Sequence, residues 1–70
     1  MRLFINGEPR EREAATVEAL FRIEAEEIGI EGPQGVAIAL NGRVLRRRDW
    51  KETPIAEGDR VEIVRAMQGG

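Results

Sequence analysis

The stretch TVEALFRIEAEEIG, residues 16–29, predicts the one helix around which the rest of the chain folds. Its apolar side chains recur at i, i+3, i+4, i+8 and i+11, as on one face of a helix, and they are Val17, Leu20, Phe21, Ala25 and Ile28. Thr16 is a favourable N-cap, and Gly29 can adopt the left-handed conformation that ends a helix. The glutamates lie on or beside the other face, and Ile23 falls off the stripe. We therefore expect a helix from Val17 to Ile28 with one buried face.

Two strand patterns precede this helix. Residues Arg2 to Asn6 are typical of a strand, and Asn6-Gly7 supplies the positive φ values of a tight hairpin turn. A second short strand is expected at about Pro9 to Glu13. The chain is thus predicted to begin with a β-hairpin.

Three more strands are predicted after the helix. A loop at residues 31–35 leads to a strand from Val36 to Leu40, and Asn41-Gly42 repeats the hairpin signal before a strand from Arg43 to Arg46. An irregular stretch from Asp49 to about Ile55 follows. The last strand is expected at Val61 to Ala66, after a turn at Gly58-Asp59.

These elements favour an α+β fold, because one helix with one apolar stripe can cover one face of one sheet. We expect a mixed sheet of about five strands that grips the helix, with residues 1–66 as the domain and residues 67–70 as a flexible tail. The expected core on the sheet side consists of the strand residues that face the helix: Leu3, Ile5, Ile38, Leu40, Val61 and Ile63.

The composition excludes several classes of function. A chain of 70 residues has room for one domain. Without cysteine or histidine, it has no disulfide, no thiolate nucleophile and none of the commonest general base. Thirteen acidic and eleven basic residues give a net charge of −2, which disfavours nucleic acid as a partner. No long apolar run follows Arg2, so we expect no membrane span and a cytoplasmic location.

The chain resembles the thiamin-biosynthesis sulfur-carrier family, ThiS, over nearly its whole length. The likeness comprises LFING at residues 3–7, ATVEAL at 15–20, VAIALNGRV at 36–44, Arg47, Trp50, Thr53-Pro54, EGDRVEI at 57–63 and Gly69-Gly70. The order and spacing of these pieces make the likeness specific, and it implies a ubiquitin-like β-grasp fold. Arg46, where the family often has proline, and the loop at residues 31–35 depart from the pattern.

The resemblance implies a carrier on which enzymes act, not an enzyme. A ThiF-like adenylyltransferase would adenylate the C-terminal carboxylate of Gly70, a sulfur donor system would convert it to a thiocarboxylate, and a ThiG-like thiazole synthase would consume the sulfur. An ionised carboxylate is a poor electrophile until it is activated, and the chain lacks a Gly-rich phosphate-binding loop. We expect no cofactor or metal on this chain, and ATP and magnesium in the adenylating partner.

The Gly-Gly end suits this task physically. Glycine has no Cβ, so Gly69 and Gly70 can thread into a narrow active site, with Met67 and Gln68 following. Four extended residues reach on the order of 13 Å. A Gly-Gly end alone is more often a frayed terminus, but its position directly after a strand pattern favours the functional interpretation.

Two surface features are candidates for partner contacts. Phe4, Val64 and Ala66 have the opposite strand parity from the core residues, so they can form an apolar docking patch with Arg65 and Met67 at its rim. Scattered surface hydrophobic residues explain the same pattern equally well. We interpret the basic run at residues 46–48, with nearby Arg43, as a solvated strand end, and Trp50 as a plug of the core.

Three alternative functions stay open. The molybdopterin-synthase small subunit and transfer-RNA-thiolation carriers share the fold and the Gly-Gly end, although the pattern from Trp50 to Val61 favours the thiamin branch. LNGRV at residues 40–44, followed by Gly58-Asp59, also resembles the end of an S4-type RNA-binding module, which needs a basic helical pair before those strands. The third alternative is a ubiquitin-like interaction domain whose tail is inert.

Overall fold

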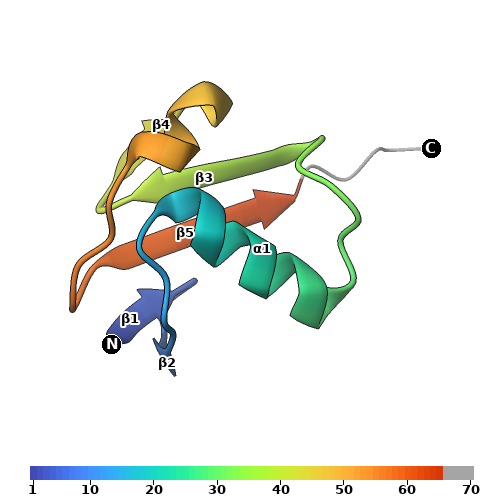
Figure 1. Cartoon of the computed structure of the whole chain (residues 1–70). Coiled ribbons are helices and arrows are strands. Elements are labelled where there is room, and N and C mark those ends of the chain that lie inside the picture. Colours follow the sequence, from blue (N-terminus) through green and yellow to red (C-terminus); the bar gives the residue numbers. More distant parts are fainter. Residues whose placement is uncertain (66–70) are drawn as a thin grey trace.

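The computed structural model describes residues 1–65, which form one five-stranded sheet with one α-helix and one 3₁₀ helix (Figure 1). The elements are β1 (Arg2–Ile5), β2 (Glu8–Glu11), α1 (Val17–Ile28), β3 (Val36–Leu40), β4 (Arg43–Leu45), η1 (Arg47–Glu52) and β5 (Arg60–Arg65). The strand order is β2-β1-β5-β3-β4. β1 and β5 are parallel and the other neighbours are antiparallel. The expected α+β fold with a mixed sheet is confirmed.

Helix α1 has the bounds that the sequence predicts. The Thr16 side chain accepts a hydrogen bond from the Ala19 N–H at 3.2 Å, so it caps the first turn. Gly29 has a φ of 81° and ends the helix in the left-handed conformation. Both helix ends are therefore set by local side-chain and backbone chemistry.

The prediction that Ile28 belongs to the core is wrong, because its side chain is 62% exposed. Beyond Gly29 the chain turns back, and the Ile30 N–H donates to the Ala25 carbonyl at 2.9 Å. This six-to-one hydrogen bond is typical of a helix C-terminus that brings the following apolar residue onto the helix. Ile30 packs against the core, whereas Ile28 stays outside it.

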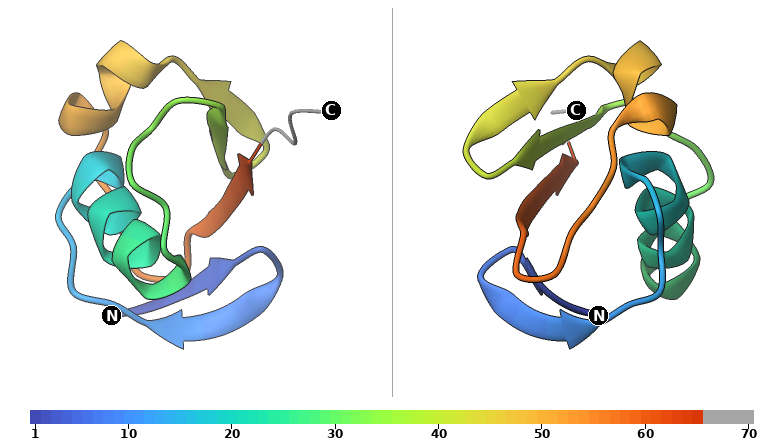
Figure 2. Two further views of the ribbon diagram at one scale, coloured as in Figure 1. Left: turned by 90° about the vertical axis from the view of Figure 1, so that its right-hand side faces the viewer. Right: turned by 60° about the vertical axis from the view of Figure 1, so that its left-hand side comes forward.

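The core lies between α1 and one face of the sheet, and no other element of residues 1–65 covers the opposite face (Figure 2). Leu3, Val17 and Val61 are 0% exposed, and Leu20 and Ile38 are 1% exposed. These residues come from α1 and from the three central strands, so the helix is held by β1, β5 and β3. The expected core residues at the strand ends, Leu40 and Ile63, are partly buried and pack against this cluster.

The stretch expected to be irregular contains the 3₁₀ helix η1, which carries Trp50 into the core. Trp50 is 2% exposed, and its ring centroid lies 5.2 Å from that of Phe21, so it plugs the core as expected. Its Nε1–H is buried and has no hydrogen-bond partner among residues 1–65. The chain after η1 is tied to the helix start, because Val17 N–H donates to the Thr53 carbonyl at 2.9 Å.

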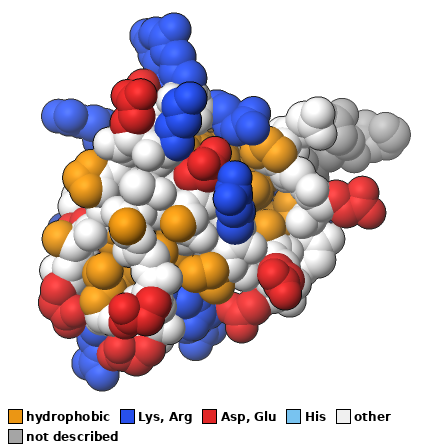
Figure 3. All heavy atoms as spheres, viewed as in Figure 1, with side chains coloured by type: hydrophobic (Ala, Val, Ile, Leu, Met, Phe, Trp, Pro, Cys, Tyr) orange, Lys and Arg blue, Asp and Glu red, His pale blue; other side chains and the backbone are white. Residues whose placement is uncertain are grey.

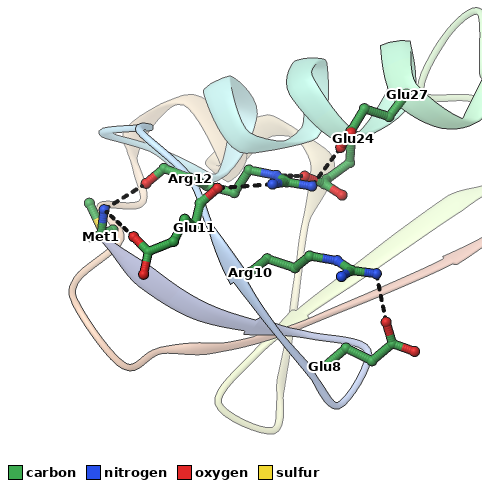
Figure 4. A network of polar contacts seen from close by, with 7 residues as sticks. All are labelled: Met1, Glu8, Arg10, Glu11, Arg12, Glu24 and Glu27. Carbon is green, nitrogen blue, oxygen red and sulfur yellow. Dashed lines mark hydrogen bonds and ion pairs between the residues drawn. The ribbon is translucent and has the colours of Figure 1, made fainter.

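The segment after the hairpin β1–β2 is joined to α1 by a partly buried ion pair (Figure 4). β2 ends at Glu11, two residues before the predicted end, and Arg12 then turns toward the helix. Its Nε donates to Glu24 and its Nη2 to Glu27, both at 2.5 Å. The expectation that the helix glutamates lie on or beside the polar face is wrong for Glu24, which is 8% exposed. Arg12 makes this burial possible because it neutralises the carboxylate.

The helices of residues 1–65 bear on two expectations from the sequence. Neither helix in that range combines the length and the apolar character needed to cross a membrane. The one α-helix that precedes β3 has the sequence VEALFRIEAEEI, which is acidic. It is not the basic helical pair that an S4-type module requires.

Candidate functional site

The last strand leads directly to the predicted reactive end of the chain. β5 is the central strand of the sheet and ends at Arg65. The predicted modified residue Gly70, the residues expected to enter partner active sites (Gly69, Gln68 and Met67) and Ala66 lie outside the described residues 1–65. The candidate site consists, within the structure, of β5 and the surfaces beside it.

β5 is anchored along both of its sides. On one side, the Phe4 N–H donates to the Asp59 carbonyl and the Asn6 N–H donates to the Val61 carbonyl, both at 2.9 Å. On the other side, β3 pairs with β5 over its whole length, from Leu40 opposite Val61 to Val36 opposite Arg65. The backbone of β5 is therefore paired with β3 as far as Arg65, whereas its pairing with β1 ends at Val61.

The open face of the sheet carries two of the four predicted docking residues, but it does not place them side by side. Phe4 is partly buried and pairs with Arg60, whereas Val64 is 60% exposed and lies four residues further along β5. Glu62 has the same parity and lies between them. Arg65 is exposed but has the opposite parity, that of the covered face.

The sequence analysis did not identify the other apolar residues that share the open face with Val64. Val64 pairs with Ala37 on β3, and Val44 on β4 pairs with Ala39. All four share the parity of the open face, and Val44 is 73% exposed. We call Ala37, Ala39, Val44 and Val64 the open-face patch. The alternation of small and large residues in VAIAL was the available signal for this patch, because it assigns the alanines to one face.

A depression lies on the open face beside Phe4, between the two Asn-Gly turns. It has a volume of about 300 Å³ and is lined by residues of both turns and of β5: Phe4, Gly7, Asn41, Gly42, Arg60, Val61 and Glu62. The open face therefore offers a hollow near Phe4 and exposed apolar side chains near Val64.

Basic side chains gather over β4 and η1, on one edge of the molecule (Figure 3). Within residues 1–65, no carboxylate lies within ion-pair distance of Arg43, Arg46, Arg47, Arg48 or Lys51. The Arg47 guanidinium carbon lies 5.8 Å from the Trp50 ring centroid, within the range of a cation–π contact. The interpretation of this run as a solvated edge stays a prediction.

The displaced pKa values belong to groups in the ion-pair network of the hairpin and α1 (Figure 4). The hydrogen bond to Glu24 raises the pKa of Arg12. The Met1 amine donates to the Glu13 carboxylate at 2.7 Å, which raises the pKa of the amine and lowers that of Glu13. Among residues 1–65, no cluster of three His, Cys, Asp or Glu could hold a metal ion.

Comparison with known proteins gives matches that cover nearly the whole chain. A family model described as the ThiS family matches residues 3–70. The sulfur carrier protein ThiS of Thermus thermophilus is 38% identical over 68 residues, which cover 97% of this chain and 98% of that protein.

Two solved structures of a thiamine biosynthesis protein from Geobacter metallireducens have a similar fold. The crystal structure, named ThiS, has a TM-score of 0.74 and 32% identity, and the match covers 100% of both chains. The solution NMR structure has the same TM-score and identity, and the match covers 100% of this chain and 88% of that one.

Proposed function

Because this chain belongs to the ThiS family of sulfur carrier proteins, we propose that the carboxylate of Gly70 is the position at which sulfur is loaded. The chain is a sulfur carrier of thiamin biosynthesis with a β-grasp fold, and it is not an enzyme. The observation that carries the proposal is that the family match extends through residue 70. It therefore includes the five residues that follow the central strand β5. The chain has neither histidine nor cysteine, so it has no imidazole or thiolate of its own to take part in sulfur transfer.

The chemistry proceeds in two steps on partner enzymes. A carboxylate oxygen of Gly70 attacks the α-phosphorus of ATP in a ThiF-like adenylyltransferase, and pyrophosphate leaves. Sulfur at the hydrosulfide level, supplied by a donor system, then attacks the carbonyl carbon and forms a C–S bond as the C–O bond to AMP breaks, which leaves a thiocarboxylate. Magnesium in the adenylating partner neutralises the phosphate charge. A ThiG-like thiazole synthase consumes the sulfur and returns the carboxylate.

Mass spectrometry of the carrier tests the site. Incubation with the cognate adenylating enzyme, ATP and a sulfur donor is expected to exchange one oxygen for sulfur, and fragmentation is expected to locate the change on Gly70. A variant without Gly70 should keep the same circular dichroism spectrum and show no exchange. Sulfur loading of that variant would contradict the proposal.

We propose that these partners dock on the open face through Phe4, Val64 and Val44, with Arg65 at its rim and Ala66, outside the described residues, next along the chain. Exposed apolar side chains on a sheet face are typical of protein contacts. The open-face patch and the depression beside Phe4 lie on the face that α1 does not cover. A partner seated there would contact the strand that leads to Gly70.

Substitution of one open-face residue tests the docking surface. Val64→Asp is expected to raise the KM of adenylation about tenfold, because a carboxylate would lose its hydration in the interface. Ile28→Asp is the matched control, since Ile28 is 62% exposed against 60% for Val64 but lies on α1. An equal KM for both variants would contradict docking on the open face.

We also propose a cytoplasmic location, because the activation step consumes ATP. The relatives reported above are named for thiamin biosynthesis or as ThiS, and this favours the thiazole branch over the molybdopterin and transfer-RNA alternatives.

A further inference from the structure

β5 is held near its two ends by side chains from two equivalent turns. Asn6 and Asn41 each precede a glycine and have φ values of 52° and 51°. The Asn41 Oδ1 accepts from the Arg60 N–H at 2.9 Å, at the start of β5. The Asn6 Oδ1 accepts from the Ile63 N–H at 2.9 Å, and its Nδ2 donates to the Ile63 carbonyl at 3.3 Å, near the end of β5.

The Asn6 side chain takes the place of a missing strand residue. Backbone pairing of β1 with β5 reaches Val61, which pairs with Ile5 and accepts from the Asn6 N–H. Two residues further along β5, at Ile63, β1 has ended. There the Asn6 side-chain amide accepts a hydrogen bond from the Ile63 N–H and donates one to the Ile63 carbonyl. A side-chain amide can do this because it carries one donor group and one acceptor group, as a peptide unit does.

We propose that Asn6 is a positioning residue for sulfur loading, because it fixes the end of β5 from which the chain continues toward Gly70. This inference rests on the proposed role of Gly70. Ile63 lies two residues before Arg65, so the Asn6 amide sets the direction in which β5 ends. Without the amide, the backbone groups of Ile63 on this side bond to water, and β3 alone holds the last residues of β5, so their orientation is less narrowly fixed. Fewer encounters with the adenylating enzyme are then productive.

Two matched glycine variants test the inference. Glycine adopts positive φ without strain, so Asn6→Gly and Asn41→Gly each preserve the turn and remove one amide. Asn6→Gly is expected to speed hydrogen exchange at the Ile63 amide. It is also expected to raise the KM of adenylation by about fivefold to tenfold, because the end of β5 must then be ordered when the carrier binds the enzyme. The kcat should stay within twofold, because the bound state is the same. Asn41→Gly is expected to speed exchange at Arg60, to leave exchange at Ile63 unchanged, and to raise KM by less than Asn6→Gly does.

The outcomes separate the possible failures. An equal KM rise in both variants would mean that general loosening of β5 is responsible, and would overturn the positioning role. Faster exchange at Ile63 in Asn6→Gly with an unchanged KM would also overturn it. Absence of any sulfur loading on the unaltered carrier would instead overturn the proposed function, and the positioning role with it.

Discussion

The two faces of the sheet are made from alternate residues of the same strands, but they are packed very differently. On β5, Val61 points toward α1 and is 0% exposed, whereas Val64 lies on the open face and is 60% exposed. On β3, Ile38 is 1% exposed, whereas its neighbour Ala37 is exposed. One face therefore holds the fold together, and the other leaves apolar side chains in water.

This difference separates stability from binding within a single strand. The covered face cannot change without a loss of packing, because its side chains are enclosed by α1 and η1. The open face can change with little effect on folding, because its side chains are solvated in the free carrier. A partner docked on the open face, as proposed above, would thus leave the core undisturbed. The predictions below test this separation.

The largest effect is expected at Trp50, on the covered side. Trp50→Ala should lower the free energy of unfolding by about 3–5 kcal/mol, since it leaves a large cavity against Phe21. Trp50→Phe should cost clearly less, because the Nε1–H that it removes makes no hydrogen bond within residues 1–65. Urea unfolding followed by circular dichroism measures both values. Equal losses would show that a phenyl ring at this position recovers none of the packing that the indole makes against Phe21.

A pair of identical substitutions on β5 compares the two faces directly. Val61→Ala should cost about 1–3 kcal/mol in the free energy of unfolding, because two buried methyl groups are removed. Val64→Ala should stay within about 0.5 kcal/mol of the unaltered carrier. Urea midpoints at a constant m-value are the measurement. Similar losses for both variants would break the comparison between the faces.

A smaller effect is expected at the ion pair that joins the hairpin to α1. Glu24→Ala should lower the free energy of unfolding by about 1–2 kcal/mol, since it leaves the partly buried Arg12 guanidinium without its closest partner. Glu26→Ala is the control, because Glu26 is exposed and makes no ion pair within residues 1–65. If the two variants unfold at the same urea concentration, the Arg12 contact does not stabilise the covered side.

The smallest effect is expected from the exposed pair of Glu13 and the Met1 amine. The hydrogen bond lowers the pKa of Glu13 in the folded state, so its contribution is present above the unfolded-state pKa and is lost as the pH falls through the folded-state pKa. Glu13→Gln should therefore flatten the fall in melting temperature on acidification, below the usual carboxyl range. Parallel pH profiles for the two proteins would show that the pair contributes nothing.

Local signals made most of the fold predictable from the sequence. Thr16 and Gly29 mark the ends of α1 because capping depends on residues within one turn. Asn6-Gly7 and Asn41-Gly42 mark the two hairpins because both need positive φ. The strand order of the β-grasp fold was implied by the family resemblance alone, since strand order depends on contacts between distant segments.

The differences between prediction and structure arise from contacts that no short window of sequence contains. Ile28 has the correct helical spacing, but the turn after Gly29 puts Ile30 on the core instead. The helical spacing alone assigns Glu24 to the polar face, but Arg12, which follows the hairpin, forms an ion pair with it and lets it be buried. On the open face, strand parity placed Val64 correctly. The position of Val44 on the same face depends on the registers of β3 with β4 and of β3 with β5.

The central position of the last strand also has a consequence for how the protein is made. The β1–β2 and β3–β4 hairpins do not pair with each other, and β5 alone joins them into one sheet. A nascent chain on the ribosome therefore cannot complete the sheet until translation has passed Arg65. Prematurely terminated products lack the joining strand and are open to proteolysis, so the folded population consists of chains synthesised at least through β5.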